Sequence, residues 1–283
     1  MSTSASAPGY VQEPPAYGAA PSPPAHKTTH AGRYQSVPQD DEEAAAARAF
    51  VGSDEEDVGR PFGVGLPVAE QDATIRSAFI KKVYSILFLQ LLLTTVVSAV
   101  LSTQNISAWV HTHQWAFIIP LIGSFVSMFV LFWKRHSHPL NLILLALFTT
   151  LEGLSIGVIV SYIDQTVVLQ ALIITLFTFA GLTFFTLYTD WDFGKLAPYL
   201  FGGLLLLVGV GFVQMLIPFS RSTDLVFAAG GCLIFSGYIV YDTWLITKRL
   251  SPDEWVLANI SLYLDIINLF INILRILNGN RDD

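Results

Sequence analysis

Long apolar runs, separated by short polar stretches, fill the chain from residue 79 onward. The segment from Val83 to Trp133 contains no Asp, Glu, Lys or Arg, and polar stretches at 102–105 and 111–114 divide it into two runs. A helix that crosses a membrane needs roughly 20 apolar residues. The pattern therefore predicts seven spans, at residues 80–102, 115–133, 139–162, 166–188, 196–217, 225–247 and 255–277.

The length of these runs indicates helices. Only helices and closed barrels satisfy all of their backbone hydrogen bonds inside a bilayer. A barrel strand alternates in polarity over about ten residues, whereas the runs here are longer and continuous. We expect an all-α integral membrane bundle of seven helices, in which the seventh span is the least apolar because it carries several polar residues.

Residues 1–78 have a different composition, with nine of the 14 prolines and two acidic clusters. No apolar pattern there is long enough to form a core, which predicts a disordered cytosolic tail in front of a seven-helix domain at 79–283. Within the tail, Pro14, Pro15 and Tyr17 form a P-P-x-Y motif, typical of WW-domain ligands. A WW-domain ubiquitin ligase is therefore an expected partner; a chance match in a Pro-rich tail is the alternative.

Charge and cysteine content narrow the class of protein. Charged residues make up 13% of the chain, against about 25% in soluble domains, which excludes a soluble globular enzyme. The tail holds 11 acidic and five basic residues, and the remainder 11 and ten. The acidity therefore belongs to the tail, and nucleic-acid binding has no electrostatic basis. The single cysteine, Cys232, excludes an intramolecular disulfide.

Lys and Arg near the span ends predict the orientation. With the N-terminus in the cytosol, eight of these residues lie inside: Arg76, Lys81, Lys82, Lys134, Arg135, Lys195, Lys248 and Arg249. Three lie outside: Arg221, Arg275 and Arg281. The N-terminus is therefore expected in the cytosol. Seven complete spans place the C-terminus outside, and a re-entrant seventh segment would place it inside.

Three carboxylic acids lie clearly inside the spans: Glu152, Asp242 and Asp265. An ionisable group at membrane depth costs at least about 2.5–3.5 kcal/mol and indicates a functional site. No Lys or Arg lies deep in a span to pair with them. They must therefore share protons, bind a cation or face water.

The short connection between spans six and seven predicts antiparallel neighbours, so Asp242 and Asp265 can meet. Two close carboxylates cannot both ionise cheaply, and such a pair titrates as a unit that can act as a pH sensor or gate. Ser261, Asp265, Asn268 and Asn272 share one face of the seventh helix, with spacings of four, three and four. This polar face lines an ion path or supplies interhelical hydrogen bonds.

Glu152 precedes Gly153 in a segment where Gly153 and Gly157 form a small-residue face that permits close approach of another helix. Glu152 is either a protonated acid bonded across that contact or a group that lines an ion path.

Two enzymatic interpretations are weaker. Residues 153–157 match the G-x-S-x-G motif of serine hydrolases, but that motif requires a strand–turn–helix and a histidine base. All six histidines lie in the tail or between spans. An aspartyl intramembrane protease needs two aspartates on adjacent helices; Tyr241-Asp242 resembles half of its pattern, and the G-x-G-D half is absent around Asp265. We expect no enzymatic activity.

Several segments resemble the Bax inhibitor-1 family, also called lifeguard or TMBIM proteins. They are Phe79–Tyr84, Leu89–Thr94, Leu151–Leu154, Tyr238–Thr243, Leu262–Phe270 and Ile273–Arg275. The match extends over residues 76–278, and the Pro- and Tyr-rich tail is more similar to the lifeguard branch. The Lys-rich C-terminal ending of some members is missing, so pH control by that ending is not expected.

The resemblance implies a seven-helix bundle with a central last helix. It also implies a Ca²⁺ leak channel or transporter that lowers stored Ca²⁺ and protects against cell death and stress, including the unfolded protein response. The family's sensor aspartates fall on Asp242 and Asp265, which would hold Ca²⁺ transiently. The expected membrane is the endoplasmic reticulum, with the Golgi or the vacuole/lysosome as alternatives.

The leading hypothesis is therefore a pH-sensitive Ca²⁺ leak gated by the two aspartates, with no cofactor besides the transported ion. The alternative is a membrane interaction protein that transports nothing and binds cell-death or stress regulators.

Overall fold

The computed structural model describes residues 65–113 and 115–279. The tail motif at Pro14, Pro15 and Tyr17 and the predicted disorder of residues 1–64 lie outside the described residues. The described helices are α2 (Ala73–Leu101), α3 (Gln104–Thr112), α4 (Trp115–Lys134), α5 (Leu140–Val160), α6 (Gln165–Tyr188), α7 (Ala197–Leu216), α8 (Arg221–Lys248) and α9 (Trp255–Gly279). Three short 3-10 helices accompany them: η2 (Val68–Glu70), η3 (Phe193–Leu196) and η4 (Pro252–Glu254).

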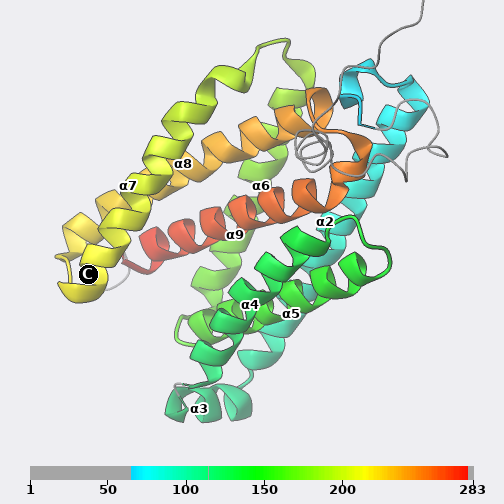
Figure 1. Ribbon diagram of the computed structural model, residues 1–283. Helices are drawn as coiled ribbons and strands as arrows, with labels where there is room; N and C mark the ends of the chain where they lie inside the picture. The colour runs from blue at the N-terminus through cyan, green and yellow to red at the C-terminus, as the bar shows by residue number, and fades with distance from the viewer. Residues whose placement is uncertain (1–64, 114, 280–283) are drawn as a thin grey trace, which may run out of the picture. The chain divides into compact units, whose positions relative to one another are not determined.

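Seven of these helices are long and apolar enough to span a membrane, which confirms the seven predicted spans (Figure 1). The bounds agree closely, except that α2 begins seven residues earlier and α8 four residues earlier than predicted. The prediction that the seventh span is the least apolar was wrong. The mean hydropathy of the α8 span is 1.6 and that of the α9 span is 1.8, because isoleucine and leucine offset the polar residues of α9.

The short helix α3 was not predicted from the sequence. Its apolar residues Ile106, Trp109 and Val110 recur with helical spacing, but a helix of nine residues is too short to span a membrane. Trp109 stacks on His113 at 4.5 Å and meets Trp115 edge-on at 5.2 Å. These aromatic contacts join α3 to the start of α4.

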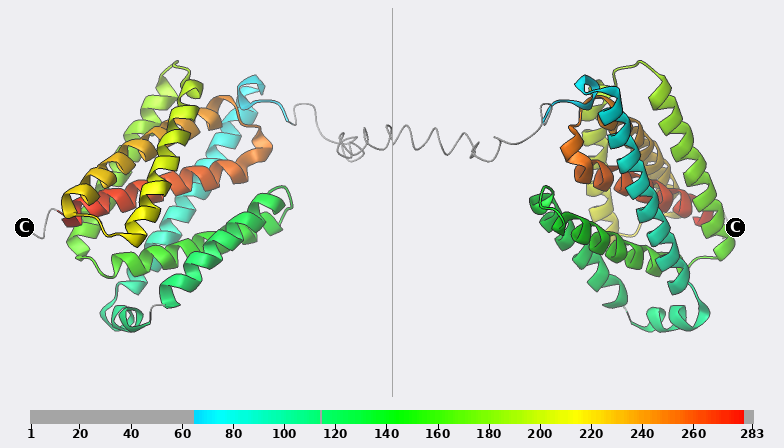
Figure 2. Two further views of the ribbon diagram at one scale, coloured as in Figure 1. Left: turned by 60° about the vertical axis from the view of Figure 1, so that its left-hand side comes forward. Right: turned by 90° about the vertical axis from the view of Figure 1, so that its right-hand side faces the viewer.

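Helix α9 is the central element of the bundle. In the most apolar stretch of α9, 61% of the residues are buried, against 6% to 50% in the corresponding stretches of the other six spans. It contacts α2, α6 and α8, and it passes between α8 and the α4–α5 pair (Figures 1 and 2). Leu262 and Tyr263 have no exposed surface. The position expected for the last helix is therefore confirmed.

Close packing of α5 on α2 depends on Gly153 and Gly157, which form the predicted small-residue face. A Cβ atom on Gly153 would lie 3.2 Å from the Cα of Thr94, and one on Gly157 would lie 3.1 Å from the Cα of Ser98. Ser98 Oγ donates to the carbonyl oxygen of Gly153 at 3.3 Å. The small-residue face thus brings the two backbones together, as the sequence predicts.

Candidate functional site

The two aspartates predicted to meet are neighbours in the structure. The η4 turn reverses the chain between α8 and α9, so the helices run antiparallel and pack along their length. Asp242 and Asp265 are 8% and 7% exposed, and their carboxyl groups lie beside one another where α8 and α9 pack together. Asp265 Oδ2 is buried and accepts no hydrogen bond from the part of the chain that the structure describes.

A hydrogen bond between two carboxyl groups requires a proton on one of them, because an ionised carboxylate only accepts. Two carboxyl groups this close can therefore hydrogen-bond to one another only when they share a proton. The same two groups, both ionised in this buried place, would repel one another and would need a cation between them.

The pair opens into a cavity of about 560 Å³ between α7, α8 and α9, whose lining is mostly apolar with a polar strip along α9. All three other polar residues of the predicted face of α9, Ser261, Asn268 and Asn272, line this cavity with Asp265. The structure thus brings together every predicted member of that face. Leu204, Leu207 and Val208 supply an apolar wall from α7.

The two asparagines are partly bonded within their own helix. Asn268 Nδ2 donates to the carbonyl oxygen of Leu264, and Asn272 Nδ2 donates to that of Asn268, both at 2.8 Å. Each side-chain amide keeps its second N–H and its oxygen for other partners. Carboxylate and carbonyl oxygens are the ligands that Ca²⁺ prefers.

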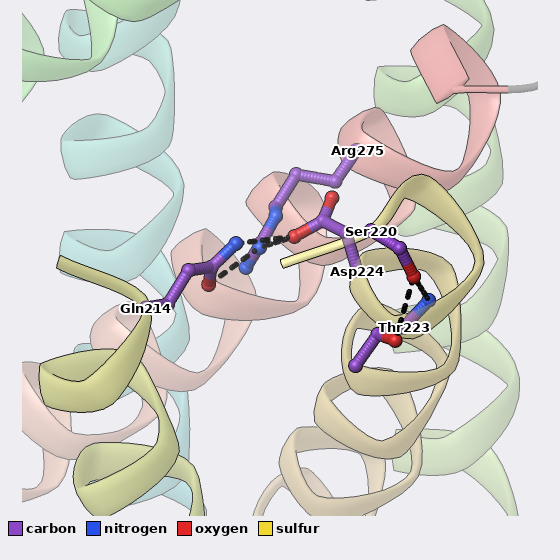
Figure 3. A network of polar contacts seen from close by, with 5 residues as sticks. All are labelled: Gln214, Ser220, Thr223, Asp224 and Arg275. Atoms are coloured by element: carbon purple, nitrogen blue, oxygen red, sulfur yellow. Dashed lines mark hydrogen bonds and ion pairs between the residues drawn. The ribbon is translucent and has the colours of Figure 1, made fainter. Parts of the chain in front are cut away.

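Gln214 and Arg275 also line the cavity, and they belong to a second polar cluster (Figure 3). Arg275 of α9 donates to Asp224 of α8 and, at 3.2 Å, to Gln214 Oε1 of α7. Gln214 Nε2 donates to Asp224 Oδ1 at 2.6 Å. This cluster of Gln214, Asp224 and Arg275, here called the Arg275 clamp, ties three helices together.

Two local features favour this geometry. Asp224 lies in the first turn of α8, where the helix dipole stabilises a negative charge, and Ser220 caps the same turn by accepting from the Thr223 amide. The guanidinium of Arg275 also lies 5.4 Å from the ring of Phe227. Arg275 is ten residues beyond Asp265, or about 15 Å along the helix.

Sequence reasoning missed the Arg275 clamp. The predicted spans place Asp224 and Arg275 at span ends, where charges are usually solvated. The depth of the two residues in the membrane could have revealed the contact. Asp224 lies near the start of span six and Arg275 near the end of the antiparallel span seven, so both lie close to the same membrane surface. Arg275 lines the same cavity as the aspartate pair but is paired with Asp224.

Glu152 does not line this cavity. It is half-buried on α5 beside Ser124 of α4, and the glycines next to it face α2. Glu152 is therefore not part of an ion path through the α7–α8–α9 cavity.

A separate set of hydrogen bonds holds α9 to the rest of the bundle. Gln90 donates to Thr149 at 3.0 Å, and the hydroxyl groups of Thr94 and Tyr263 are 2.8 Å apart. These bonds link α2 to α5 and to α9 on the side of α9 away from the aspartates. In the sequence, such side chains look like ordinary core residues.

In the described ranges, no group of three or more His, Cys, Asp or Glu side chains could hold a metal ion. A cation at the aspartate pair would have two carboxylates, and its other ligands would be neutral oxygens or water. That set suits an ion in transit better than a resident structural metal, since tight Ca²⁺ sites use more charged ligands.

These features define a class: a helical membrane protein with seven candidate spans around a buried acidic pair and the cavity that it lines. The family model described as "Inhibitor of apoptosis-promoting Bax1" matches residues 76–282. The chain therefore belongs to the Bax inhibitor family, as the sequence motifs predict.

Three relatives show the extent of the similarity. Protein lifeguard 4 of Mus musculus is 45% identical over 77% of this chain and 92% of its own length. Bax inhibitor 1 of Schizosaccharomyces pombe is 40% identical over 86% of this chain and 95% of its own length. The Golgi anti-apoptotic protein of vaccinia virus (strain Lister) is 42% identical over 76% of this chain and 91% of its own length.

Proposed function

We propose that this protein is a Ca²⁺ leak path of an intracellular membrane and that it restrains cell death by lowering stored Ca²⁺. The observation that carries the proposal is the buried pair of Asp242 and Asp265 in a cavity that the polar face of α9 lines on one side. Two carboxylates without a basic partner of their own are an unfavourable way to join helices. They are a favourable way to bind a divalent cation.

The shared proton gives the pair its pH dependence. With one proton, the pair hydrogen-bonds and ties α8 to α9. When the proton leaves, two negative charges remain, and Ca²⁺ can bind between them. Proton and Ca²⁺ therefore compete for the same oxygens, so Ca²⁺ occupancy rises as pH rises. Tyr238 and Tyr241 are the titratable neighbours of the pair on α8.

The Arg275 clamp supplies the second half of the proposal. A guanidinium that lines the cavity repels an approaching cation, and Asp224 offsets that charge. The clamp also holds α7, α8 and α9 together. Opening the path then requires the clamp to break or shift.

The test is Ca²⁺ flux into liposomes that contain the purified full-length protein, measured over a pH series. We expect flux that increases with pH, and we expect Asp242→Asn and Asp265→Asn each to abolish that dependence. Asp190→Asn, which changes an exposed loop aspartate, is the matched control and should behave as the wild type. Flux equal to that of empty liposomes at every pH would refute the leak.

The names of the relatives support a second candidate function. Bax inhibitor 1 and the Golgi anti-apoptotic protein are named for opposing apoptosis, which a membrane protein can also do by binding regulators. This candidate predicts that the two Asp→Asn variants change capture of cell-death or stress regulators from cells while liposomes show no flux.

The membrane in which the protein resides is also part of the proposal. The endoplasmic reticulum follows from the sequence resemblance, and the name of the vaccinia relative favours the Golgi. Imaging of the tagged full-length chain against markers of both membranes distinguishes the two.

A further inference from the structure

A second cavity, of about 540 Å³, lies on the other side of α9, between α2 and α6. Both helices pack on α9. Residues from Phe88 to Ser102 of α2 and from Gln165 to Leu176 of α6 form its walls, and Ile266, Ile267 and Phe270 of α9 form its floor. We call this cavity the α2–α6 crevice.

Helix periodicity places the crevice and the cavity of the aspartate pair on opposite faces of α9. At 100° per residue, Ile266, Ile267 and Phe270 are centred about half a turn from Asp265, Asn268 and Asn272. The buried helix that carries Asp265 therefore separates the cavity of the aspartate pair from the α2–α6 crevice, which is more apolar. A molecule in the crevice would press on α9 from behind the aspartate pair.

The walls of the crevice are mainly apolar, and the hydroxyl groups in them already have hydrogen-bond partners. The hydroxyl groups of Thr95, Ser102 and Thr175 donate to carbonyl oxygens of their own helices, at 2.8 Å, 2.9 Å and 2.7 Å. Ser98 donates to the carbonyl oxygen of Gly153, and the Thr94 hydroxyl meets both Tyr263 and the Gln90 carbonyl oxygen. An occupant that needs hydrogen bonds would gain few here, whereas an apolar chain loses nothing.

The opening of the crevice lies on membrane-spanning helices. Phe88 and Leu92 on α2 and Leu169 on α6 line it and are 65%, 49% and 56% exposed. The medium that these exposed apolar side chains meet in a bilayer is lipid. The occupant therefore enters from the hydrocarbon and not from water.

The crevice extends through at least one leaflet. α2 and α6 are the first and fourth spans, so they run in opposite directions, and the crevice begins where Ser102, at the end of α2, and Gln165, at the start of α6, both line it. It follows α6 for 11 residues to Leu176, or about 16 Å, and α2 for 14 residues to Phe88, or about 21 Å. Half of a hydrocarbon core of about 30 Å is about 15 Å, so the crevice reaches the middle of the membrane along α6 and passes it along α2.

We propose that the α2–α6 crevice binds one acyl chain of a membrane phospholipid, taken from the leaflet at the Ser102 and Gln165 end. The headgroup lies at that end, and the chain runs inward between Ala99 and Leu172 toward Phe88. The lipid fills the gap behind α9 and holds that helix against α8. This site is independent of the proposed Ca²⁺ function.

The test uses the full-length protein in nanodiscs that contain a phospholipid with a photoactivatable diazirine in one acyl chain. After illumination and digestion, mass spectrometry locates the labelled residues. We expect the label to concentrate on residues 88–102 and 165–176. Label spread evenly over the exposed faces of α2, α4, α6 and α7 would overturn the proposal, and this result needs no variant.

Filling the crevice is the second arm. Ala99 is exposed and lines the crevice, so Ala99→Trp places an indole where the acyl chain would lie. Ala180→Trp changes an exposed alanine of α6 outside the crevice and is the matched control. We expect Ala99→Trp to lose the crosslink and Ala180→Trp to keep it. An unchanged crosslink in Ala99→Trp would show that the label does not come from this site.

Discussion

The role of a single polar side chain in this bundle depends on the residue that faces it from the neighbouring helix. Asp265 would be an isolated buried charge without Asp242, and Asn272 lies against Gly231, where a Cβ would collide with its side-chain amide. The glycine is therefore part of the site: it leaves room for an amide that lines the cavity. Neither relation is visible along one helix alone.

Gly231→Ala tests this contact. The new methyl group must displace Asn272, whose side chain is buried and bonded to the carbonyl oxygen of Asn268, or push α8 away from α9. We expect a loss of stability of about 1–3 kcal/mol, as for other overpacked cores. The measurement is the midpoint of thermal unfolding in detergent.

The neighbouring Gly230 provides the control, because a Cβ there would meet nothing within 4 Å. Gly230→Ala should be neutral or stabilising by up to about 1 kcal/mol, since alanine is the better helix former. Equal shifts of the unfolding midpoint in Gly231→Ala and Gly230→Ala would mean that the contact with Asn272 does not limit the size of the side chain at position 231.

Helix pairs in this protein are joined unequally. α8 and α9 pack closely on one another, whereas α7 contacts mainly α8 and η3. Only 6% of the residues in the apolar stretch of α7 are buried. The Arg275 clamp is therefore a main polar link between α7 and the core. An ion pair that is about one-third exposed is partly screened by solvent, so its effect on stability is moderate.

A double-mutant cycle of Arg275→Gln and Asp224→Asn measures this link. Each single change leaves one charged group without its partner, and we expect each to cost on the order of 2 kcal/mol. The double variant should lose less than the sum, because no unpaired charge remains. In liposomes, both single variants should also raise Ca²⁺ flux if the clamp closes the proposed path.

Lys195→Gln, which removes an exposed charge of η3, controls for the general effect of lost positive charge. Additive losses in thermal stability for the two clamp residues would contradict a direct coupling between them.

The bundle as a unit depends on how its outer helices reach α9. α4 packs on α5, and α5 packs on α2, which itself contacts α9. The α4–α5 pair is thus held to the core mainly through the glycine face of α5. Loosening that face should affect the whole assembly.

Gly157→Val tests the arrangement. The side chain would collide with Leu101 and with the backbone of Ser98, so α5 must move away from α2. We expect a loss of about 1–3 kcal/mol in thermal stability, with earlier proteolysis between α4 and α5. Gly181→Val, at a position of α6 with open space around its Cβ, should leave both measurements close to the wild type.

The seven spans, the family and the meeting of Asp242 with Asp265 could all be predicted from the amino-acid sequence. The reason is that span length, polarity and a short helix connection are local properties, and a buried carboxylate stands out against apolar neighbours. The polar face of Ser261, Asn268 and Asn272 was visible for the same reason.

Other features could not be predicted in this way, because they depend on which faces pack together over long sequence distances. Glu152 lies beside Ser124 of α4, and Arg275 joins Gln214 and Asp224 from two other helices. The two cavities on opposite sides of α9 exist only because α7 meets α8 loosely and α2 stands apart from α6. Periodicity tells which residues share a face, but the folded bundle alone selects what that face meets.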